Sequence, residues 1–151
     1  MNVRALEPGD ADAILSIQAE SPEVAQWSKR AYERLVQEKM IGWTAEANGS
    51  ISGFVAARQV AGDAEILNFA VRSDARRRGI GARLLNEVLA WAKNARAEKI
   101  YLEVRESNQA ARAFYERHGF RETGRRPRYY DAPTEDALLL TLSLAPEASR
   151  G

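Results

Sequence analysis

The spacing of apolar residues along the chain predicts short strands alternating with amphipathic helices. Several runs alternate apolar and polar residues with the two-residue period of a strand, and others repeat apolar residues every three to four positions, as on one face of a helix. The clearest helix follows Arg78, and its apolar face consists of Ile80, Leu84, Leu85, Val88, Leu89 and Ala92. The predicted order of elements is β-α-α-β-β-β-α-β-α-β-β.

Two helices are predicted after a short strand at Val3–Leu6. Asp10 is expected to cap the first, because an aspartate carboxylate accepts hydrogen bonds from the free N–H groups at a helix start. The second is predicted from Ser28 to about Lys39, and the connection before it contains Trp27. The apolar side of this second helix consists of Tyr32, Leu35 and Val36.

Three antiparallel strands are predicted next. Asn48-Gly49 favours a tight hairpin turn with positive φ between strand-like runs over Gly42–Ala47 and Ile51–Val60. Gly62-Asp63 forms a second turn before a run that ends at Val71. The helix and strand that follow then predict one parallel pair within a mixed sheet.

The C-terminal part predicts a strand over Lys99–Val104, a helix and a final antiparallel pair. Asn108 should cap the helix, which runs through His118 and places Tyr115 at the margin of the core. The last two strands are predicted over Phe120–Arg126 and Ala137–Leu144, joined by a long connection that contains Pro127, Tyr129, Tyr130 and Pro133.

Composition limits what this chain can be. Its 151 residues fit one domain, predicted at residues 1–144 with a polar tail over 145–151, and 45% hydrophobic with 28% charged residues is typical of a soluble globular protein. A net charge of +1 argues against general polyanion binding. No run approaches the ~18 apolar residues of a membrane span. With no cysteine and one histidine, neither a disulfide nor a structural metal site is expected, and these features favour the cytoplasm.

The segment Val71–Leu85 carries the strongest chemical signal. It combines the end of a strand, three successive arginines and two glycines one residue apart at the start of a helix. Free N–H groups and a partial positive charge make a helix start an anion site, and glycines let a ligand approach the backbone. A pyrophosphate is the expected ligand. The alternative interpretation is a solvated basic helix start that binds no ligand. Neither a Gly-x-Gly-x-x-Gly nor a Gly-Lys-Ser/Thr motif is present.

Read as Arg76-x-x-Gly79-x-Gly81, this loop resembles the acyl-coenzyme A loop of the GNAT superfamily of N-acetyltransferases. The predicted element order resembles the GNAT fold from Val3 to about Leu144. The resemblance implies a single-domain α/β (α+β) fold with a mixed, mostly antiparallel seven-stranded sheet and about four helices. It also implies acetyl-CoA as co-substrate, without a metal, held by Phe69, Ala70, Val71, Arg76, Arg77, Arg78, Gly79, Ile80, Gly81, Ala82 and Asn108. The Val71 N–H would then be an oxyanion donor.

A second segment, from Glu103 to Phe120, resembles the RimI-type ribosomal-protein alanine N-acetyltransferases. It reads Glu103-Val104-Arg105-x-x-Asn108-x-x-Ala111-x-x-Phe114-Tyr115-x-x-x-Gly119-Phe120. The resemblance implies direct transfer with Glu103 as general base and Tyr115 as general acid. From the residues alone, Glu103 could instead be a solvent-facing strand residue, and Tyr115 a residue at the edge of the core.

The acceptor side rests on shorter matches. Trp27 with Ser28, and Tyr129-Tyr130, resemble two walls that hold a peptide N-terminus in this subfamily. The resemblance implies a protein substrate, the N-terminal alanine of a small-subunit ribosomal protein. Trp27 could instead be a buried anchor between helices, and His118 is expected to be only a cation at a helix C-terminus.

The choice of amine also follows from protonation. An α-amine has a pKa of about 7.7–8.0 and lysine about 10.4, so far more of the α-amine is neutral near pH 7. This favours an N-terminal acceptor without excluding lysine or a small amine. A non-catalytic module that binds RNA phosphates through the loop arginines is a further alternative, although near-neutral charge argues against it. No direct nucleic-acid or membrane partner is expected.

Overall fold

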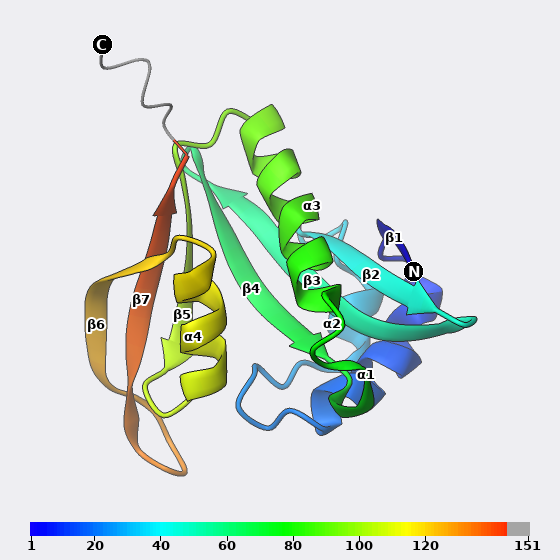
Figure 1. The fold of residues 1–151 in the computed structure, drawn as a ribbon, viewed down its shortest axis with the longest axis horizontal. Helices are drawn as coiled ribbons and strands as arrows, with labels where there is room; N and C mark the ends of the chain where they lie inside the picture. Colours follow the sequence, from blue (N-terminus) through cyan, green and yellow to red (C-terminus); the bar gives the residue numbers. More distant parts are fainter. Residues whose placement is uncertain (145–151) are drawn as a thin grey trace.

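A seven-stranded sheet in the order β1-β2-β3-β4-β5-β7-β6 forms the centre of the computed structural model, which describes residues 1–144 (Figure 1). The strands are β1 (Asn2–Ala5), β2 (Ile41–Ala47), β3 (Ser50–Val60), β4 (Asp63–Val71), β5 (Lys99–Arg105), β6 (Arg121–Tyr130) and β7 (Glu135–Ser143). The helices are α1 (Ala11–Ala19), α2 (Lys29–Glu33), α3 (Ile80–Asn94) and α4 (Gln109–Arg117). Short 3-10 turns occur at Pro8–Asp10 and Ser73–Ala75. The predicted fold class and element order are confirmed, and the predicted tail at 145–151 lies outside the described residues.

The two central strands, β4 and β5, are the one parallel pair in the sheet, as the sequence predicts. Their pairing covers only two steps, Ala64 with Ile100 and Glu65 with Tyr101. Beyond these residues the strands separate, and Figure 1 shows them diverging toward the bottom of the view. The sheet is therefore divided at its centre, with β1–β4 on one side and β5, β7 and β6 on the other.

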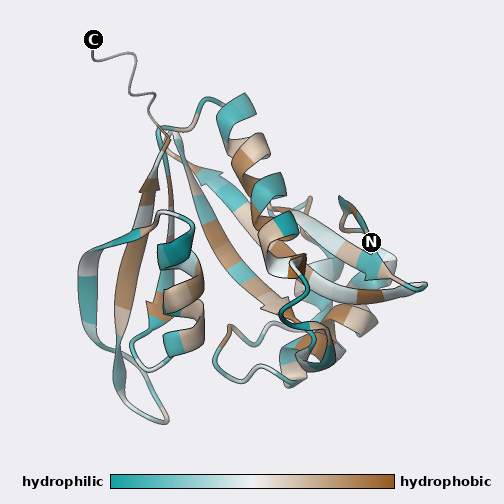
Figure 2. Ribbon diagram, viewed as in Figure 1, coloured by the Kyte–Doolittle hydropathy of each residue, from teal (hydrophilic) through white to brown (hydrophobic). Residues whose placement is uncertain are grey.

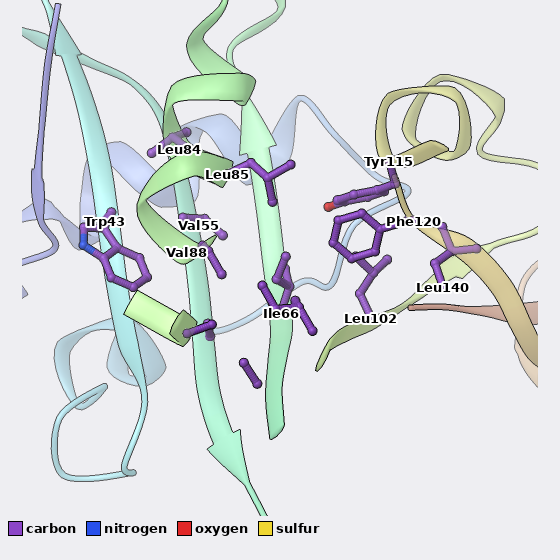
Figure 3. Packing of buried hydrophobic residues seen from close by; sticks show 14 of the residues in the cluster. Trp43, Val55, Ile66, Leu84, Leu85, Val88, Leu102, Tyr115, Phe120 and Leu140 are labelled. Atoms are coloured by element: carbon purple, nitrogen blue, oxygen red, sulfur yellow. The ribbon is translucent and has the colours of Figure 1, made fainter. Parts of the chain in front are cut away.

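Each face of the sheet is covered by its own apolar cluster. Because side chains alternate between the faces of a strand, Val55 and its neighbour Phe54 on β3 belong to different clusters. Val55 packs under α3 with Trp43 and Leu84, as Figure 3 shows, whereas Phe54 packs with α1 and Tyr32. Figure 2 shows the contrast between apolar β7 and polar β6, which is an edge strand.

The predicted hairpins form with the expected turn chemistry. Asn48 and Gly49 have φ angles of 54° and 79° between β2 and β3. Positive φ at both central residues gives a turn whose twist matches that of the strands. The second turn was predicted at Gly62-Asp63, but it consists of Ala61 and Gly62, with φ of 50° and 88°, and Asp63 is the first residue of β4, where it opposes Val60.

The second helix is shorter than predicted. It was expected over Ser28–Lys39, but α2 ends at Glu33, because the next residue, Arg34, leaves the helical conformation with φ −109° and ψ 18°. The chain continues in turns to Lys39, whose φ of 60° ends this segment before β2. Leu35 is buried as expected, but the prediction for Val36 was wrong, because its side chain is 81% exposed.

Asp10 stands at the start of α1 but does not cap it. Its Oδ2 accepts hydrogen bonds from the Glu7 N–H at 2.7 Å and from Arg4 Nη1 at 2.9 Å, and its Oδ1 accepts one from Arg4 Nη2 at 2.8 Å. Glu46 on β2 binds the same guanidinium at 2.7 Å. The hydrogen bonds from Arg4 hold the pKa of Asp10 below its usual range. Asp10 therefore ties α1 to the β1–β2 edge.

The connection between the last two strands is also shorter than predicted. Tyr129 and Tyr130 were expected in a loop, yet β6 continues to Tyr130. The register shifts between Arg126, which opposes Ala137, and Tyr130, which opposes Glu135. The strand bulges outward here, because five residues from Arg126 to Tyr130 face three on β7.

No helix within residues 1–144 is long and apolar enough to cross a membrane.

We predict that Asp10→Asn lowers the free energy of unfolding at pH 7 by about 2 kcal/mol, since hydrogen bonds to charged groups are worth about 1.5–3 kcal/mol. The folded pKa of Asp10 lies below the unfolded value of 3.8, so its contribution is complete above pH 3.8 and is lost as the pH falls through the folded pKa. Urea unfolding of both proteins should therefore converge in strong acid. Asp12→Asn is the control, because its pair with Lys29 is exposed to solvent and should contribute little to stability. A constant difference down to pH 2 would contradict the prediction.

Candidate active site

A cleft of about 860 Å³ opens between the start of α3 and the side of α4. Its walls also include the end of β4 and the connection between α1 and α2. Ten of the eleven residues predicted to hold the co-substrate line it: Phe69, Ala70, Val71, Arg76, Arg77, Gly79, Ile80, Gly81, Ala82 and Asn108. Arg78 is the exception, since it lies outside the lining. The cleft lies on the side of β4 that β5 leaves unpaired.

The start of α3 and the loop before it line part of the cleft. Arg77 and Gly79 have φ angles of 64° and 79°, and α3 begins at Ile80. Successive N–H groups in such a turn, together with the partial positive charge of the helix, form a concave site for phosphate oxygens. Gly81 allows α3 to approach α4, because a Cβ there would lie 3.2 Å from Phe114 Cε1.

Arg76 is bound by the protein itself. Its Nε donates to the Val71 carbonyl at 3.2 Å, and its Nη2 donates to Ser21 Oγ at 3.1 Å. The nearby Ser73 N–H donates to Glu20 Oε1 at 3.1 Å. These contacts fasten the loop before α3 to the connection after α1, so Arg76 positions two walls of the cleft relative to each other.

The Val71 N–H points toward the divided centre of the sheet. The Arg72 N–H donates to the Ser52 carbonyl on β3 at 2.8 Å. Because backbone groups of successive residues point to opposite edges of a strand, the N–H and carbonyl of Val71 point to the edge from which β5 has separated. The hydrogen bond from Arg76 to the Val71 carbonyl agrees with this direction. The group predicted as an oxyanion donor is therefore directed toward the cleft.

Tyr115 is more deeply buried than predicted. It was placed at the margin of the core with Phe114 inside, but its side chain is 6% exposed, while Phe114 is partly exposed and packs on the rim. The Tyr115 ring makes edge contacts with Phe69 and Phe120, and Figure 3 shows its hydroxyl directed away from α4. Burial raises the pKa of Tyr115 above the usual range of a phenol. Its hydroxyl therefore stays neutral and can donate a hydrogen bond within the cleft it lines.

Glu103 lies on the other face of β5 and does not line the cleft. Leu102 and Val104 point into the core under α4, so the intervening Glu103 points away from it. Its side chain is 19% exposed, and Oε2 is 2.9 Å from Arg126 Nε on β6. The N–H does not point at the oxygen, and within the described chain this buried oxygen receives no hydrogen bond. The contact is an ion pair without hydrogen-bond geometry.

Two tyrosines from the end of β6 lie beside Glu103. Arg105 stacks on the Tyr130 ring at 4.2 Å and donates to Glu135 at 3.0 Å. Burial, and next the charge of Glu103, raise the pKa of Tyr130. Tyr129 is half exposed, with Arg126 5.3 Å from its ring centre. The two tyrosines and Glu103 thus share one face of the sheet.

These features of fold and cleft can be compared with known proteins. Residues 11–120 match the acetyltransferase (GNAT) family. The chain belongs to this family. It is an N-acetyltransferase, and the resemblance predicted from its motifs is confirmed.

Among relatives of this acetyltransferase, the ribosomal protein bS18-alanine N-acetyltransferase of Escherichia coli (strain K12) is 30% identical over 145 residues, covering 95% of this chain and 97% of the relative. The crystal structure of the ribosomal-protein alanine N-acetyltransferase from Escherichia coli superposes with a TM-score of 0.82 at 30% identity, over 97% of this chain and 96% of that one. A GNAT family acetyltransferase from Elizabethkingia anophelis, solved with acetyl-CoA bound, has a TM-score of 0.76 at 24% identity, over 95% and 97% of the chains.

Trp27 and Ser28 lie beside α2 in this acetyltransferase and do not line the cleft. The Ser28 hydroxyl caps α2 by accepting from the Ala31 N–H at 3.3 Å. The Trp27 ring stacks on Tyr32 at 5.4 Å between centroids and is partly buried. The anchoring function left open for Trp27 is therefore present, and contact with an acceptor remains a prediction.

A buried polar network that the sequence analysis missed supports this region. Asn68, in the apolar strand β4, donates to the Ala25 carbonyl at 2.9 Å and to the Tyr32 hydroxyl at 3.0 Å. The Tyr32 hydroxyl in turn donates to Gln18, whose amide donates to the Trp27 carbonyl at 2.8 Å. Buried polar groups need partners, so this network holds the α1–α2 connection in place. A lone asparagine in an apolar strand was the available signal.

Three carboxylates on the strands of the sheet are each paired with an arginine. Glu65 pairs with Arg58, and Glu135 with Arg105. Asp136 pairs with Arg125. Hydrogen bonds from Ser107 and Arg105 lower the pKa of Glu135. The pair of Asp136 with Arg125 lies within the β6–β7 hairpin, and that of Glu135 with Arg105 joins the hairpin to β5.

Asn108 and His118 mark the two ends of α4. The Asn108 side chain caps the helix by accepting from the Ala111 N–H at 3.2 Å, as predicted. His118 Nδ1 lies 2.8 Å from the Phe114 carbonyl, and its ring stacks on Phe114 at 4.5 Å. Both residues line the cleft. Across residues 1–144, no group of three or more candidate ligands is arranged to hold a metal ion.

Proposed function

We propose that this acetyltransferase transfers the acetyl group of acetyl-CoA to the N-terminal α-amine of a protein, with the N-terminal alanine of a small-subunit ribosomal protein as the favoured acceptor. The observation that carries the proposal is the two-sided site. The cleft with its anion-binding helix start lies on the α3–α4 face, and Glu103 with Tyr130 lies on the other face, across the division between β4 and β5. The activity of the Escherichia coli relatives, N-acetylation of a ribosomal protein at alanine, supports the same choice of acceptor.

The residues of the cleft fit acetyl-CoA. The turn at Arg77–Gly79 and the first N–H groups of α3 would bind the pyrophosphate. The free edge of β4 offers backbone groups to an extended pantetheine arm, as a neighbouring strand would. This arrangement would bring the thioester to the end of β4, where the Val71 N–H is directed.

The reaction needs three groups at that point. Glu103 would take a proton from the acceptor ammonium or from the attacking amine, whose nitrogen forms a bond to the thioester carbon. The Val71 N–H would donate to the oxyanion that develops on the carbonyl oxygen. The carbon–sulfur bond then breaks, and the Tyr115 hydroxyl would donate its proton or a hydrogen bond to the sulfur. Because burial keeps Tyr115 neutral, this donor is available throughout the neutral pH range.

We predict that acetylation depends on a free α-amine. Thioester consumption should be fastest with peptides that begin with alanine or serine, because their α-amines lose a proton more readily than lysine does. The same peptides with a formylated N-terminus and an internal lysine should react at least about a hundred-fold more slowly. Equal rates on internal lysines or free polyamines, with none on the alanine-initiated peptides, would reject the N-terminal acceptor.

We predict that Gly79→Ala weakens CoA binding. A side chain at φ of 79° is strained by about 1 kcal/mol, and relief of this strain would turn N–H groups away from the ligand. Calorimetry should show a Kd for CoA raised about five- to ten-fold, equivalent to roughly 1 kcal/mol. Gly62→Ala is the matched control, because its φ is 88° and its Cβ position is equally open, but it lies in the β3–β4 turn. Equal CoA affinity in both variants would remove the loop from the site.

We predict that Glu103→Gln lowers kcat by about a hundred- to ten-thousand-fold, the range expected for losing a general base. The Kd for CoA should stay unchanged, since Glu103 does not line the cleft. Glu65→Gln is the control, because Glu65 lies on the neighbouring strand and is bound to Arg58. Steady-state kinetics would measure both, and a wild-type kcat in Glu103→Gln would remove this residue from the mechanism.

A further inference from the structure

The ion pair between Arg126 and Glu103 has a consequence for the acceptor. β7 lies between β5 and β6, so the Arg126 side chain reaches across a whole strand to place its Nε 2.9 Å from Glu103 Oε2. The oxygen it covers is buried and receives no hydrogen bond from residues 1–144. A carboxylate oxygen in this state can accept from an incoming ammonium group at little cost in lost hydrogen bonds.

The same guanidinium occupies the position that an acceptor ammonium would take. Its Nε lies 2.9 Å from Glu103 Oε2, within the distance at which an ammonium group would donate a hydrogen bond to that oxygen. An acceptor ammonium brings an equivalent positive charge together with the proton that Glu103 has to take. The two cations compete for one oxygen.

Arg126 is able to leave. Its side chain is 64% exposed, and its guanidinium already lies 5.3 Å from the centre of the Tyr129 ring. It stands at the last regular position of β6 before the bulge that contains Pro127 and Arg128, the latter with a φ of 53°. Arg105, which also lies on this face, is held by Glu135 and Tyr130 and is only 19% exposed. Arg126 can therefore leave its carboxylate partner more readily than Arg105 can.

We propose that Arg126 pairs with Glu103 until a cationic acceptor displaces it, and that this competition sets the affinity of the enzyme for a cationic amine. Without acceptor it neutralises the carboxylate. When an acceptor binds, its ammonium replaces the guanidinium, which withdraws toward Tyr129 and solvent. Arg126 is a positioning residue in this scheme, because it acts through Glu103. The inference rests on the proposed function of Glu103.

The test is a binding measurement with matched peptides and variants. An alanine-initiated hexapeptide without lysine, and the same peptide with a formylated N-terminus, are titrated calorimetrically into the CoA-saturated enzyme. We expect Arg126→Gln to lower the Kd of the free-amine peptide by about two- to five-fold, the size expected for an exposed ion pair. The Kd of the formylated peptide and that of CoA should not change. In a Glu103→Gln background, Arg126→Gln should have no effect.

Arg121→Gln controls for the change in net charge, because Arg121 is exposed on the same strand and takes part in no ion pair among the described residues. If Arg121→Gln lowers the Kd of the free-amine peptide as much as Arg126→Gln does, the effect comes from net charge in general, and the proposed displacement of Arg126 is rejected. An unchanged or higher Kd in Arg126→Gln, with wild-type enzyme that binds and acetylates the peptide, also rejects it. Failure of the wild-type enzyme to bind or acetylate the free-amine peptide would instead reject the proposed function.

Discussion

The organisation of this enzyme depends on one constraint, the loss of pairing between β4 and β5 after two residues. A strand edge without a partner exposes hydrogen-bonding groups that need one. In β4 these groups face the cleft, where an extended ligand can supply the missing partner. The same separation leaves Glu103 on β5 beside the division, bonded through its backbone only to β7. The two substrates can therefore meet at the centre of the sheet from opposite faces.

A divided sheet needs other contacts to hold its two sides at fixed positions. On the β4 side, Asn68 and Arg76 bind the α1–α2 connection to the strand and to the loop before α3. On the β5 side, Arg105 ties the strand to the end of the β6–β7 hairpin through Glu135. These contacts are polar, and they lie in or just after the two strands that flank the division. The apolar clusters determine the overall fold, whereas the polar contacts position the walls of the site.

The features that the sequence predicted well are those determined by local pattern. The element order, the Asn48-Gly49 turn, the cap at Asn108 and the start of α3 after the glycine-containing loop each depend on neighbouring residues. The errors arose where tertiary structure overrode such patterns. The second helix ends at Glu33 and Val36 lies in solvent, and the β6 ladder with β7 draws Tyr129 and Tyr130 out of the expected loop. Tyr115 faces the core because the neighbouring rings Phe69 and Phe120 receive it, which helical spacing alone does not show.

The two substrate sides also differ in how they are encoded. The co-substrate side is built from main-chain groups, whose direction follows once a strand, a loop and a helix are recognised in order. The proposed acceptor side depends on side-chain contacts across long separations, such as Arg105 with Glu135 and Asn68 with the Ala25 carbonyl, which are 30 and 43 residues apart. No local pattern specifies these pairs. A relative could retain the motif for acetyl-CoA while exchanging the partner of Glu103, and its preference among amines would then change without any change in the loop before α3.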